Sequence, residues 1–393
     1  MTSSFAEVGL PADLVGSLRA RGVIVPFEIQ AKVIPTAIGG RDVCGRAPTG
    51  SGKTLAFGLP IAMRVRKAKP KRPTALILAP TRELAMQIAD ELAPLLQLRG
   101  RTIGAFYGGA GFGPQLKKLA RGVDVAVACP GRLADLMRRS LIALDDVEIV
   151  VVDEADRMAD MGFLPEVKRI LDCVKPDRQT MLFSATLDGA VDVLVKRYQH
   201  DPIRCEVSSP KATEDRNAHH FVTTGRHLRL AATLDLVVEH GSTVVFCRTK
   251  HGADRVAKQL TTAGVSAVAI HGNRSQAQRE RALAAFSSGR AQALVATDVA
   301  ARGIHVDDVA CVVHFDVPAD AKDYVHRSGR TGRAGASGVV VTFVTEEDGD
   351  KVRVLQKDLG MKPAGGPPRQ KNRQRRVSDP KRRSRRASSR PRR

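Results

Sequence analysis

Eight short apolar segments alternate with longer amphipathic or polar stretches along the chain. The first four are TALILAP, VDVAVACP, VEIVVVDEAD and QTMLFSAT, and the last four are STVVFCRT, VSAVAIHG, AQALVATD and VACVVHFD. Their apolar runs are continuous rather than alternating, which is typical of strands buried on both faces of a parallel sheet. The helix-length intervals between them predict βα units. The pattern therefore predicts an α/β fold.

The eight segments fall into two similar sets, separated by the polar stretch SSPKATEDRN at residues 208–217. This stretch contains Pro210 and has no apolar periodicity, so it is the best candidate for a linker. A chain of 393 residues is too long for one ordinary core. We expect one α/β domain at residues 1–207 and a second at 218–361. The likeness of the two sets is architectural, because no repeat of fixed period is present.

The net charge of +22 is concentrated at the C-terminal end of the chain. Residues 362–393 contain fourteen Lys or Arg against the single acid Asp379, so they carry +13 and leave +9 for the rest. With almost no apolar residues, this stretch cannot offset its ordering entropy, and we expect a disordered tail. Such a tail is either a solubilising end or, as the arginine density favours, a tether for nucleic-acid phosphates.

The remaining composition narrows the class of protein. The six cysteines are scattered without close pairs, which favours neither a zinc site nor a disulfide framework. The N-terminus lacks the basic and apolar regions of a signal peptide, and no apolar run approaches about 20 residues, the length of a membrane span. We expect a protein of the reducing cytoplasm with no membrane segment.

The stretch APTGSGKT at residues 47–54 resembles a phosphate-binding loop, although Ala47 stands where the pattern has its first glycine. Gly50 and Gly52 let backbone N–H groups wrap around phosphate oxygens. Lys53 would bring its charge to the β and γ phosphates, and the Thr54 hydroxyl would ligate Mg²⁺. Thr49 and Ser51 complete the predicted loop. The alternative is a glycine-rich turn with an incidental lysine.

The stretch VEIVVVDEADRM, residues 147–158, ends an apolar run in three carboxylates, Asp153, Glu154 and Asp156. Crowded carboxylates repel one another unless a cation, a water or a basic partner lies among them. A phosphate loop needs a carboxylate opposite it to hold Mg²⁺, largely through water, and Asp153 fits that role. Glu154 is then placed to activate the attacking water. The alternative is an acidic helix start.

The second set of segments contributes the basic stretch YVHRSGRTGRAG at residues 324–335. Its spacing predicts that Arg330 and Arg333 act as arginine fingers, which stabilise charge on the transferred phosphoryl group. A solvated basic loop is an equally good interpretation of the arginines alone.

A dozen motifs occur in a fixed order along the chain. They are Phe5, GVIVPFEIQ ending in Gln30, APTGSGKT, PTREL, the pair Gly108 and Gly109, CPGR, DEAD, SAT, VVFCRT, QAQR, ATDVAARGIHV and HRSGRTGR. In this set and order the chain resembles the DEAD-box ATP-dependent RNA helicases, over nearly its whole length apart from the tail. The resemblance implies two tandem RecA-like domains, each a parallel sheet flanked by helices, that bind ATP with Mg²⁺ and single-stranded RNA.

The resemblance also implies roles for individual residues around the nucleotide. Gln30 would read the adenine edge while Phe5 stacks on the ring. Ser184 and Thr186 would couple the nucleotide site to strand separation through the region of Asp156 and His326. The links between the ATP and RNA faces would be three further residues, Asp298, Arg302 and Gly303, the last also at the nucleotide.

The implied RNA path uses groups suited to phosphate and ribose, namely short hydroxyls, glycine N–H groups and arginine forks. Its residues would be Thr81, Arg82, Gly108, Gly109, Pro130, Gly131, Arg132, Gln276, Arg279 and Thr297. The chain has no Trp and only three Tyr, which favours binding of the RNA backbone without sequence readout.

Three positions depart from the family pattern. Phe27 replaces a threonine before Gln30, and Cys129 replaces the threonine of the TPGR pattern, a better phosphate donor. His305 stands where an aspartate bonds the ribose, and Asp307 is the nearest substitute. None touches phosphoryl transfer, so we expect changed nucleotide affinity rather than loss of ATPase activity.

The sequence therefore predicts a monomeric ATP-dependent RNA helicase that locally unwinds or remodels RNA or RNA–protein complexes, with ribosomal or RNA-decay proteins as partners. The alternative is an RNA chaperone or annealer driven by the basic tail, with incidental ATPase activity. A DNA helicase of related architecture is less favoured by DEAD, PTREL and HRSGRTGR together.

Overall fold

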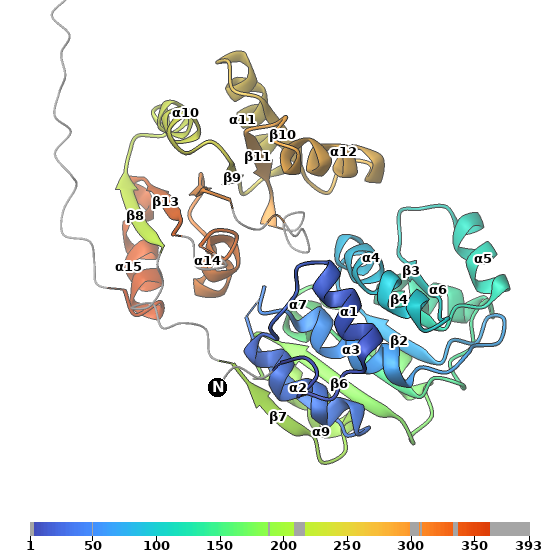
Figure 1. The fold of residues 1–393 in the computed structure, drawn as a ribbon. Helices are drawn as coiled ribbons and strands as arrows, with labels where there is room; N and C mark the ends of the chain where they lie inside the picture. Colours follow the sequence, from blue (N-terminus) through green and yellow to red (C-terminus); the bar gives the residue numbers. More distant parts are fainter. Residues whose placement is uncertain are drawn as a thin grey trace, which may run out of the picture.

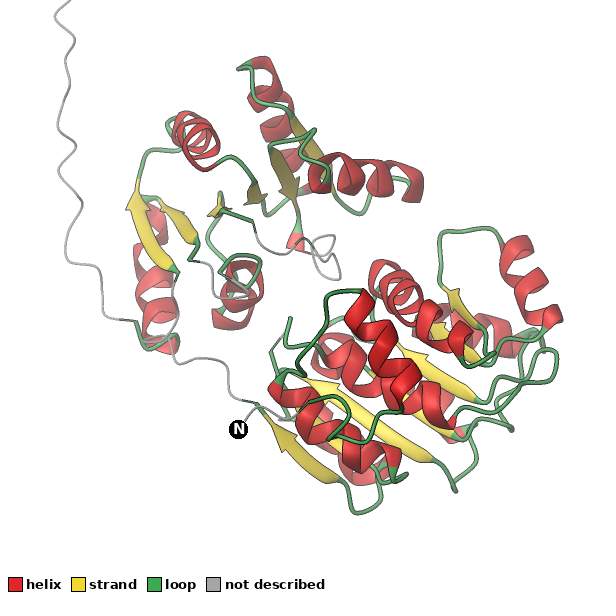
Figure 2. Ribbon diagram, viewed as in Figure 1, coloured by secondary structure: helices red, strands yellow, loops and turns green. Residues whose placement is uncertain are grey.

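The computed structural model describes residues 4–48, 50–187, 189–207, 217–298, 306, 309–332 and 337–361. These residues form two α/β units, each built on a parallel sheet (Figures 1 and 2). The fold class predicted from the apolar segments is thus confirmed. The predicted tail and most of the predicted linker lie outside the described residues, and the domain boundaries stay a prediction.

The first unit contains a seven-stranded sheet in the order β3-β4-β2-β5-β6-β1-β7. Its strands are β1 (Val43–Arg46), β2 (Ala75–Leu78), β3 (Ile103–Phe106), β4 (Val125–Ala128), β5 (Ile149–Val152), β6 (Gln179–Ser184) and β7 (Ile203–Glu206). The strands β2, β4, β5 and β6 are buried along their whole length. This burial explains their continuous apolar pattern, because helices cover both faces.

Two hydrophobic clusters sandwich the first sheet. One contains side chains of α1 (Ala12–Ala20), α2 (Glu28–Ile38), α3 (Lys53–Arg64) and α4 (Arg82–Leu98). The other contains side chains of α5 (Phe112–Arg121), α6 (Pro130–Arg138), α7 (Ala155–Asp160), α8 (Leu164–Asp172) and α9 (Ala190–Tyr198). Within β2, Ile77 belongs to the first cluster and its neighbours Leu76 and Leu78 to the second, as the two-residue period of a strand requires.

The second unit contains a six-stranded sheet in the order β10-β11-β9-β12-β13-β8. Its strands are β8 (Ala218–Thr223), β9 (Thr243–Phe246), β10 (Ala267–Ile270), β11 (Ala293–Ala296), β12 (Cys311–His314) and β13 (Val339–Val344). On one face pack α10 (Arg229–His240) and α11 (Lys250–Thr262). On the other pack α12 (Gln276–Ser287), α14 (Ala321–Ser328) and α15 (Gly349–Asp358), which follows a short 3₁₀ helix at Glu346–Asp348.

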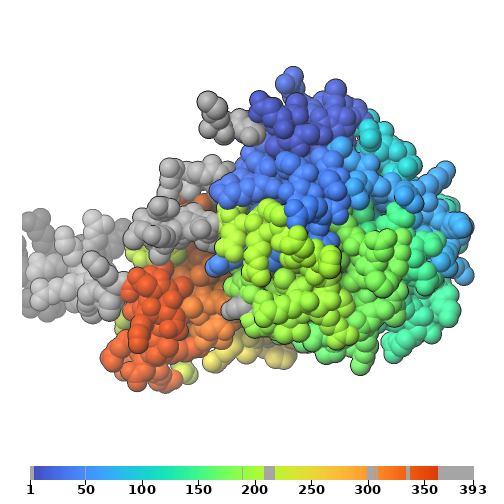
Figure 3. All heavy atoms as spheres, turned by 90° about the horizontal axis from the view of Figure 1, so that it is seen from below, coloured from blue at the N-terminus to red at the C-terminus, as the bar shows by residue number. Residues whose placement is uncertain are grey.

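The two units lie against each other, as the space-filling view also shows (Figure 3). Ion pairs join them. Lys322 Nζ on α14 lies 2.7 Å from Asp160 Oδ2 on α7, and Arg279 Nη2 on α12 lies 3.0 Å from Glu83 Oε1 on α4. The second pair is almost completely buried, with side-chain exposures of 7% and 6%.

Because all strand pairs are parallel, the carboxyl ends of the strands gather at one edge of each sheet. The phosphate loop follows β1 and the DEAD stretch follows β5, so the topology brings them to the same edge. Among the described residues, no helix has the length and apolar character that crossing a membrane requires.

A close approach between α3 and α4 supplies a test of the packing. A Cβ added at Gly58 would lie 2.1 Å from Leu92 Cδ2, and Leu92 is completely buried. We expect Gly58→Ala to lower the free energy of unfolding by about 1–3 kcal/mol, because the core must shift to admit the methyl group. Urea denaturation of the full chain measures the change.

The matched control is Gly16→Ala in α1, where nothing lies within 4 Å of an added Cβ. A glycine in a helix interior costs conformational entropy, so this variant should gain about 0.5–1 kcal/mol. Equal effects of the two substitutions would contradict the close packing of α3 on α4.

Candidate nucleotide and RNA site

The phosphate loop is folded around its own lysine. Gly50 and Gly52 have φ angles of 82° and 83°, which only glycine adopts without strain. Lys53, the first residue of α3, is 8% exposed. Its Nζ donates hydrogen bonds to the carbonyl oxygens of Ala47 (2.9 Å) and Pro48 (3.3 Å). The cation is thus already held at the helix N-terminus, where a phosphate would bind.

Gln30 ties the start of α2 to this loop. Its Oε1 accepts a hydrogen bond from the Phe27 backbone N–H (2.9 Å), and its Nε2 donates to the Gly52 carbonyl (2.9 Å). A Cβ at Gly52 would lie 2.4 Å from Gln30 Nε2 and 2.6 Å from Phe27 Cδ2. The Phe27 side chain therefore packs directly against the loop, although it remains 59% exposed.

Phe5 lies in the core of the first unit, and its predicted stacking on adenine stays a prediction. It is 2% exposed and belongs to the hydrophobic cluster of α1 to α4. Its large apolar side chain is more stable in this core than against solvent. An aromatic ring that is open to solvent beside the loop is that of Phe27, the residue that replaces a threonine of the family pattern.

The DEAD stretch carries a buried ion pair that the sequence did not predict. Glu154 adopts a left-handed conformation with φ 51°, which costs a non-glycine residue about 1–3 kcal/mol. Its Oε2 accepts a hydrogen bond from Arg157 Nη1 at 2.7 Å. The exposures of the two side chains are 10% and 3%. Arg157 therefore fixes the carboxylate that was assigned the role of base.

The ionisation of Glu154 follows from its surroundings. Burial alone would raise the pKa, but the charges of Arg157, Lys53 and Arg330 and the Arg157 hydrogen bond lower the pKa to about 2. Arg330 comes from the second unit, directly after α14, and is 5% exposed. Charged groups of both units therefore stabilise the ionised form of the proposed base, Glu154.

Some of the residues predicted to couple the nucleotide site to the RNA site lie close together. The Asp156 backbone N–H donates to Ser184 Oγ at 3.2 Å, while Asp156 Oδ2 is buried without a hydrogen-bond partner among the described residues. Burial lowers the pKa of His326 on α14, and the Asp156 and Glu154 carboxylates oppose this shift. Thr186 lies directly after β6, half-buried.

Asp298 has a partner that the sequence analysis did not assign. Arg327 donates from Nε to Asp298 Oδ1 (2.6 Å) and from Nη2 to Oδ2 (2.7 Å), a bidentate pair. Arg327 also donates to the Asp316 carbonyl at 2.9 Å. This arginine of the HRSGR stretch therefore fastens α14 to the end of β11.

Several predicted positions lie outside the described residues, and their roles stay predictions. They are Thr49 in the loop, Arg302 and Gly303 in the ATDVAARGIHV stretch, the finger Arg333, and the departures His305 and Asp307.

On the first unit, the predicted RNA residues follow β2, β3 and β4. Thr81 caps α4, its Oγ1 accepting from the Leu84 N–H at 3.3 Å. A Cβ at Gly109 would lie 2.6 Å from Arg82 Nη1, so this glycine and arginine are in contact. Arg132 Nη2 donates to the Ala110 carbonyl at 3.0 Å. The loop after β3 thus joins the starts of α4 and α6.

The other members of this group surround the same strand ends. Pro130 is the first residue of α6, Gly131 follows it, and Gly108 precedes Gly109. Cys129 caps no backbone group through its side chain, and burial raises the pKa of its thiol to about 12. The thiol therefore stays neutral, a weaker donor than the threonine of the family pattern.

On the second unit, the predicted RNA residues follow β10 and β11. Gln276 begins α12 and donates to Glu280 at 2.9 Å, and Thr297 is 6% exposed. Arg279 is 5% exposed and pairs with Glu83 across the two units. Glu83, which the PTREL motif contains but the sequence analysis did not single out, thus brings both halves of the predicted path together.

The chemistry around the loop fits a nucleotide with Mg²⁺. Asp153 is 3% exposed, and Thr54 lies next to Lys53 at the start of α3. Among the described residues, no three His, Cys, Asp or Glu side chains gather as a metal site. A bound Mg²⁺ would take Thr54 and Asp153 as its protein ligands, with phosphate and water oxygens as the rest.

A phosphate loop and an acidic strand end on one parallel-sheet unit, facing an arginine of a second such unit, define a protein of the two-domain RecA-like class. The DEAD/DEAH box helicase model matches residues 27–193, and the helicase conserved C-terminal domain model matches 226–335. DEAD-box ATP-dependent RNA helicase 30 of Arabidopsis thaliana is 41% identical over 90% of this chain, which spans only 61% of that relative. The Bacillus subtilis DEAD-box ATP-dependent RNA helicase CshA is 38% identical, over 91% of this chain and 72% of its own. The chain belongs to the DEAD-box ATP-dependent RNA helicase family.

A solved relative has the same arrangement of both units. Saccharomyces cerevisiae Dbp5 bound to RNA and ADP BeF3 is 30% identical and superposes with a TM-score of 0.82, covering 92% of this chain and 94% of Dbp5. A variant of Dbp5 bound to Nup159, Gle1, IP6 and ADP, 28% identical, gives 0.63 over 90% and 94%. The structure is therefore more similar to Dbp5 with RNA than to Dbp5 in the other assembly.

The buried pair of Glu154 and Arg157 predicts a large loss of stability in Arg157→Leu. Removing one partner of a buried ion pair costs about 3–5 kcal/mol, because the other charge stays buried. The matched control is Arg169→Leu, whose pair with Glu166 has the same spacing but a 76% exposed arginine. It should cost less than about 1 kcal/mol. Chemical denaturation of the full chain measures both.

The pH dependence of this difference has a definite sign. The folded pKa of Glu154, about 2, lies below the ordinary value of 4.5, so the pair stabilises the fold above pH 4.5 and progressively less toward pH 2. The stability gap between the parent chain and Arg157→Leu should narrow over this window. A gap independent of pH would show that lost packing, not charge, causes the destabilisation.

Proposed function

We propose that this chain is an RNA-stimulated ATPase that couples ATP hydrolysis to local unwinding or remodelling of structured RNA or RNA–protein complexes. The main observation in support concerns the buried carboxylate of Glu154. Its pKa is lowered by Lys53 of the first unit and also by Arg330 of the second. Such a site is complete only when the units are together. The likeness to Dbp5 bound to RNA and ADP BeF3 supports the same arrangement.

In this proposal the residues around the phosphate loop divide the chemistry. Lys53 and the N–H groups of the loop hold the phosphates, and Thr54 with Asp153 holds Mg²⁺, which neutralises phosphate charge when bound. Glu154 orients and deprotonates the attacking water. Arg330, with Arg333, stabilises charge on the transferred phosphoryl group. Gln30 recognises adenine through the second N–H of its amide and the second lone pair of Oε1, which its present hydrogen bonds leave available.

The proposed RNA path runs over the strand ends that carry Thr81, Arg82, Arg132 and Arg279. Because hydroxyls and guanidinium groups predominate, the path binds phosphate and ribose without sequence readout. The Arg279 pair with Glu83 lies in the middle of this path, so bound RNA and the joining of the two units depend on the same arginine. The basic tail adds a tether that binds phosphates and weakens with salt.

The wider setting of the protein is also a proposal. We propose a cytoplasmic monomer whose partners are ribosomal or RNA-decay proteins. Its departures at Phe27, Cys129 and His305 change nucleotide affinity and leave phosphoryl transfer intact.

The role of Glu154 as the base is tested by Glu154→Gln. Losing a general base lowers the turnover number by about 10²–10⁴-fold, while ATP-dependent binding of RNA should persist because the amide keeps the shape of the side chain. Steady-state hydrolysis is compared without nucleic acid, with single-stranded RNA and with single-stranded DNA. Binding of labelled RNA is measured with ATP present.

The matched control is Glu166→Gln on α8, which should hydrolyse ATP as the parent chain does. Loss of RNA binding together with turnover in a Glu154→Gln chain that thermal denaturation shows to be folded would contradict its role as the base. Equal ATPase rates with RNA, with DNA and without nucleic acid would contradict the proposal that ATP hydrolysis is coupled to RNA. RNA remodelling lost on deletion of residues 363–393 while ATPase activity remains would favour the chaperone alternative.

A further inference from the structure

The two sheets of this chain have the same strand order. In the first, the order is β3-β4-β2-β5-β6-β1, followed by β7, and in the second it is β10-β11-β9-β12-β13-β8. Each strand of the second sheet therefore has a counterpart in the first. The loop after β8 corresponds to the phosphate loop after β1, and the loop after β12 corresponds to the DEAD stretch after β5.

A shared helix cap supports this correspondence residue by residue. Thr81 follows the end of β2 by three residues, caps α4 and accepts a hydrogen bond from Leu84 N–H. Thr249 follows the end of β9 by three residues, caps α11 and accepts from Gly252 N–H at 3.0 Å. The strands β2 and β9 are thus equivalent in register as well as in order.

The register then identifies the counterparts of the catalytic residues. Ala75 of β2 pairs with Ile149 of β5, and its equivalent Thr243 pairs with Cys311 of β12. Counting along the paired strands, Phe315 takes the place of Asp153 and Asp316 takes the place of Glu154. In the same way α10, the helix after β8, begins with Arg229 where α3 begins with Lys53.

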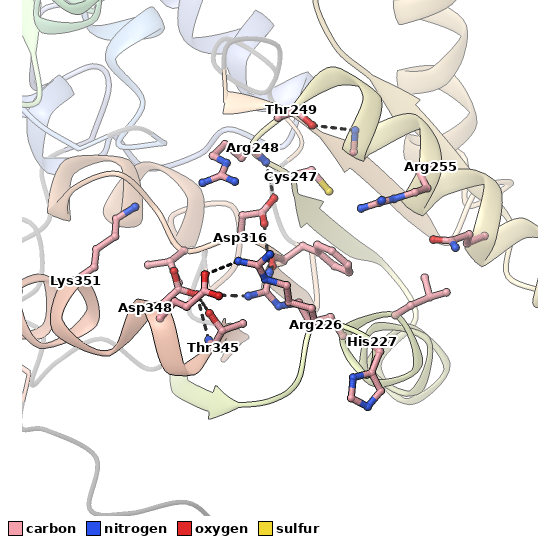
Figure 4. A pocket seen from close by; sticks show the side chains of 17 residues that line it. Arg226, His227, Cys247, Arg248, Thr249, Arg255, Asp316, Thr345, Asp348 and Lys351 are labelled. Carbon is pink, nitrogen blue, oxygen red and sulfur yellow. Dashed lines mark hydrogen bonds and ion pairs between the residues drawn. The ribbon is translucent and has the colours of Figure 1, made fainter.

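A cavity of about 710 Å³ lies at this place in the second unit. Its lining comes from the residues after β8, β9, β12 and β13, the strands equivalent to β1, β2, β5 and β6. Figure 4 shows Arg226, Arg248, Arg255 and Lys351 around it, on separate elements. The cavity is thus the counterpart of the nucleotide site at the ligand-binding edge of a parallel sheet.

The charges in the cavity favour an anion. Arg229, 7% exposed, donates to the Phe315 carbonyl (2.9 Å) and pairs with Asp316 (3.3 Å) and Asp348 (3.4 Å). It therefore neutralises much of the acidic charge of the cavity floor, while its buried Nε has no hydrogen-bond partner among the described residues.

The rim of the cavity is cationic. Arg226 pairs with Glu347. The exposed side chains of Arg248, Arg255 and Lys351 form no ion pair with a residue in the described part of the chain. The first turns of α10 and α11 also contribute to the lining through Leu230 and Gly252, which adds the positive ends of two helices. Guanidinium groups at a helix start are the usual partners of phosphate.

We propose that this cavity is a second phosphate-binding site, which takes a phosphate ester or pyrophosphate group without a metal ion and without hydrolysing it. A phenylalanine, Phe315, stands where the first unit has the carboxylate suited to Mg²⁺. Asp316, which stands in the position of the base, forms an ion pair with Arg229. The phosphate group can come from a free nucleotide or from RNA, and the experiment below separates these two sources.

The test uses the full chain with Lys53→Ala, which weakens phosphate binding at the first site. Binding of inorganic pyrophosphate is measured by titration calorimetry in EDTA, so that no metal contributes. The site variant adds Arg255→Glu and Lys351→Glu. The control variant adds Lys258→Glu and Lys357→Glu. These substitutions change the net charge by the same amount on the same two helices, α11 and α15, but lie outside the cavity lining.

We expect the site variant to bind pyrophosphate at least about tenfold more weakly than the control variant, since each charged hydrogen bond to phosphate contributes about that factor. All four substituted side chains are exposed, so both variants should fold, which thermal denaturation checks. Equal affinity of the two variants, or no binding to the Lys53→Ala chain, would overturn the proposal.

Competition against pyrophosphate identifies the source of the phosphate. Displacement by AMP or ADP in EDTA supports a free nucleotide, and displacement only by a short RNA carrying a 5′-phosphate supports RNA. Failure of all of these to displace pyrophosphate would overturn a site for phosphate esters. The measurement needs no ATP hydrolysis, so its outcome is independent of the proposed RNA-stimulated ATPase.

Discussion

The structure depends most on the parallel register of its two sheets. Parallel pairing places the carboxyl ends of the strands at one edge, and many of the residues assigned a role lie in the loops and helix starts that follow these strand ends. The phosphate loop, the DEAD stretch and the SAT stretch are far apart in sequence but lie at the ends of β1, β5 and β6, which are consecutive in the sheet. The same register in the second sheet brings the residues of its cavity together.

Buried charges give this edge its geometry. Glu154 pairs with Arg157, Asp298 with Arg327 and Glu83 with Arg279, and each of these arginines is nearly inaccessible. A buried charge without its partner is costly, so each pair fixes the position of the element that carries it. The third pair joins α4 to α12, so the relative position of the two units is set partly by residues of the predicted RNA path.

The fold was predictable because continuous apolar strands leave a strong pattern, and the motifs were predictable because their residue types match phosphate chemistry. The burial of Phe5 could not be predicted, since a sequence does not say which aromatic residues pack into a core, and its stacking on adenine stays a prediction. Arg157 and Glu83 were missed because their importance comes from burial and from a partner, neither of which has a local pattern. Asp298 was predicted to link the two faces and Arg327 lies in the HRSGR stretch, but their pairing could not be predicted without the fold.

The correspondence between the sheets explains why one unit hydrolyses ATP in our proposal and the other does not. Both have a cation at the start of the helix after β1 or β8 and a carboxylate after β5 or β12, Lys53 with Glu154 and Arg229 with Asp316. In the first unit Lys53 is bonded to loop carbonyls and Glu154 to Arg157. In our proposal both act on the bound phosphate, and Asp153 next to Glu154 holds Mg²⁺. In the second, the cation and the carboxylate are bound to each other, and Phe315 replaces the metal ligand. The same strand order therefore places cationic side chains at the corresponding edge of both sheets, but only the first has carboxylates placed to act on a phosphate in our proposal.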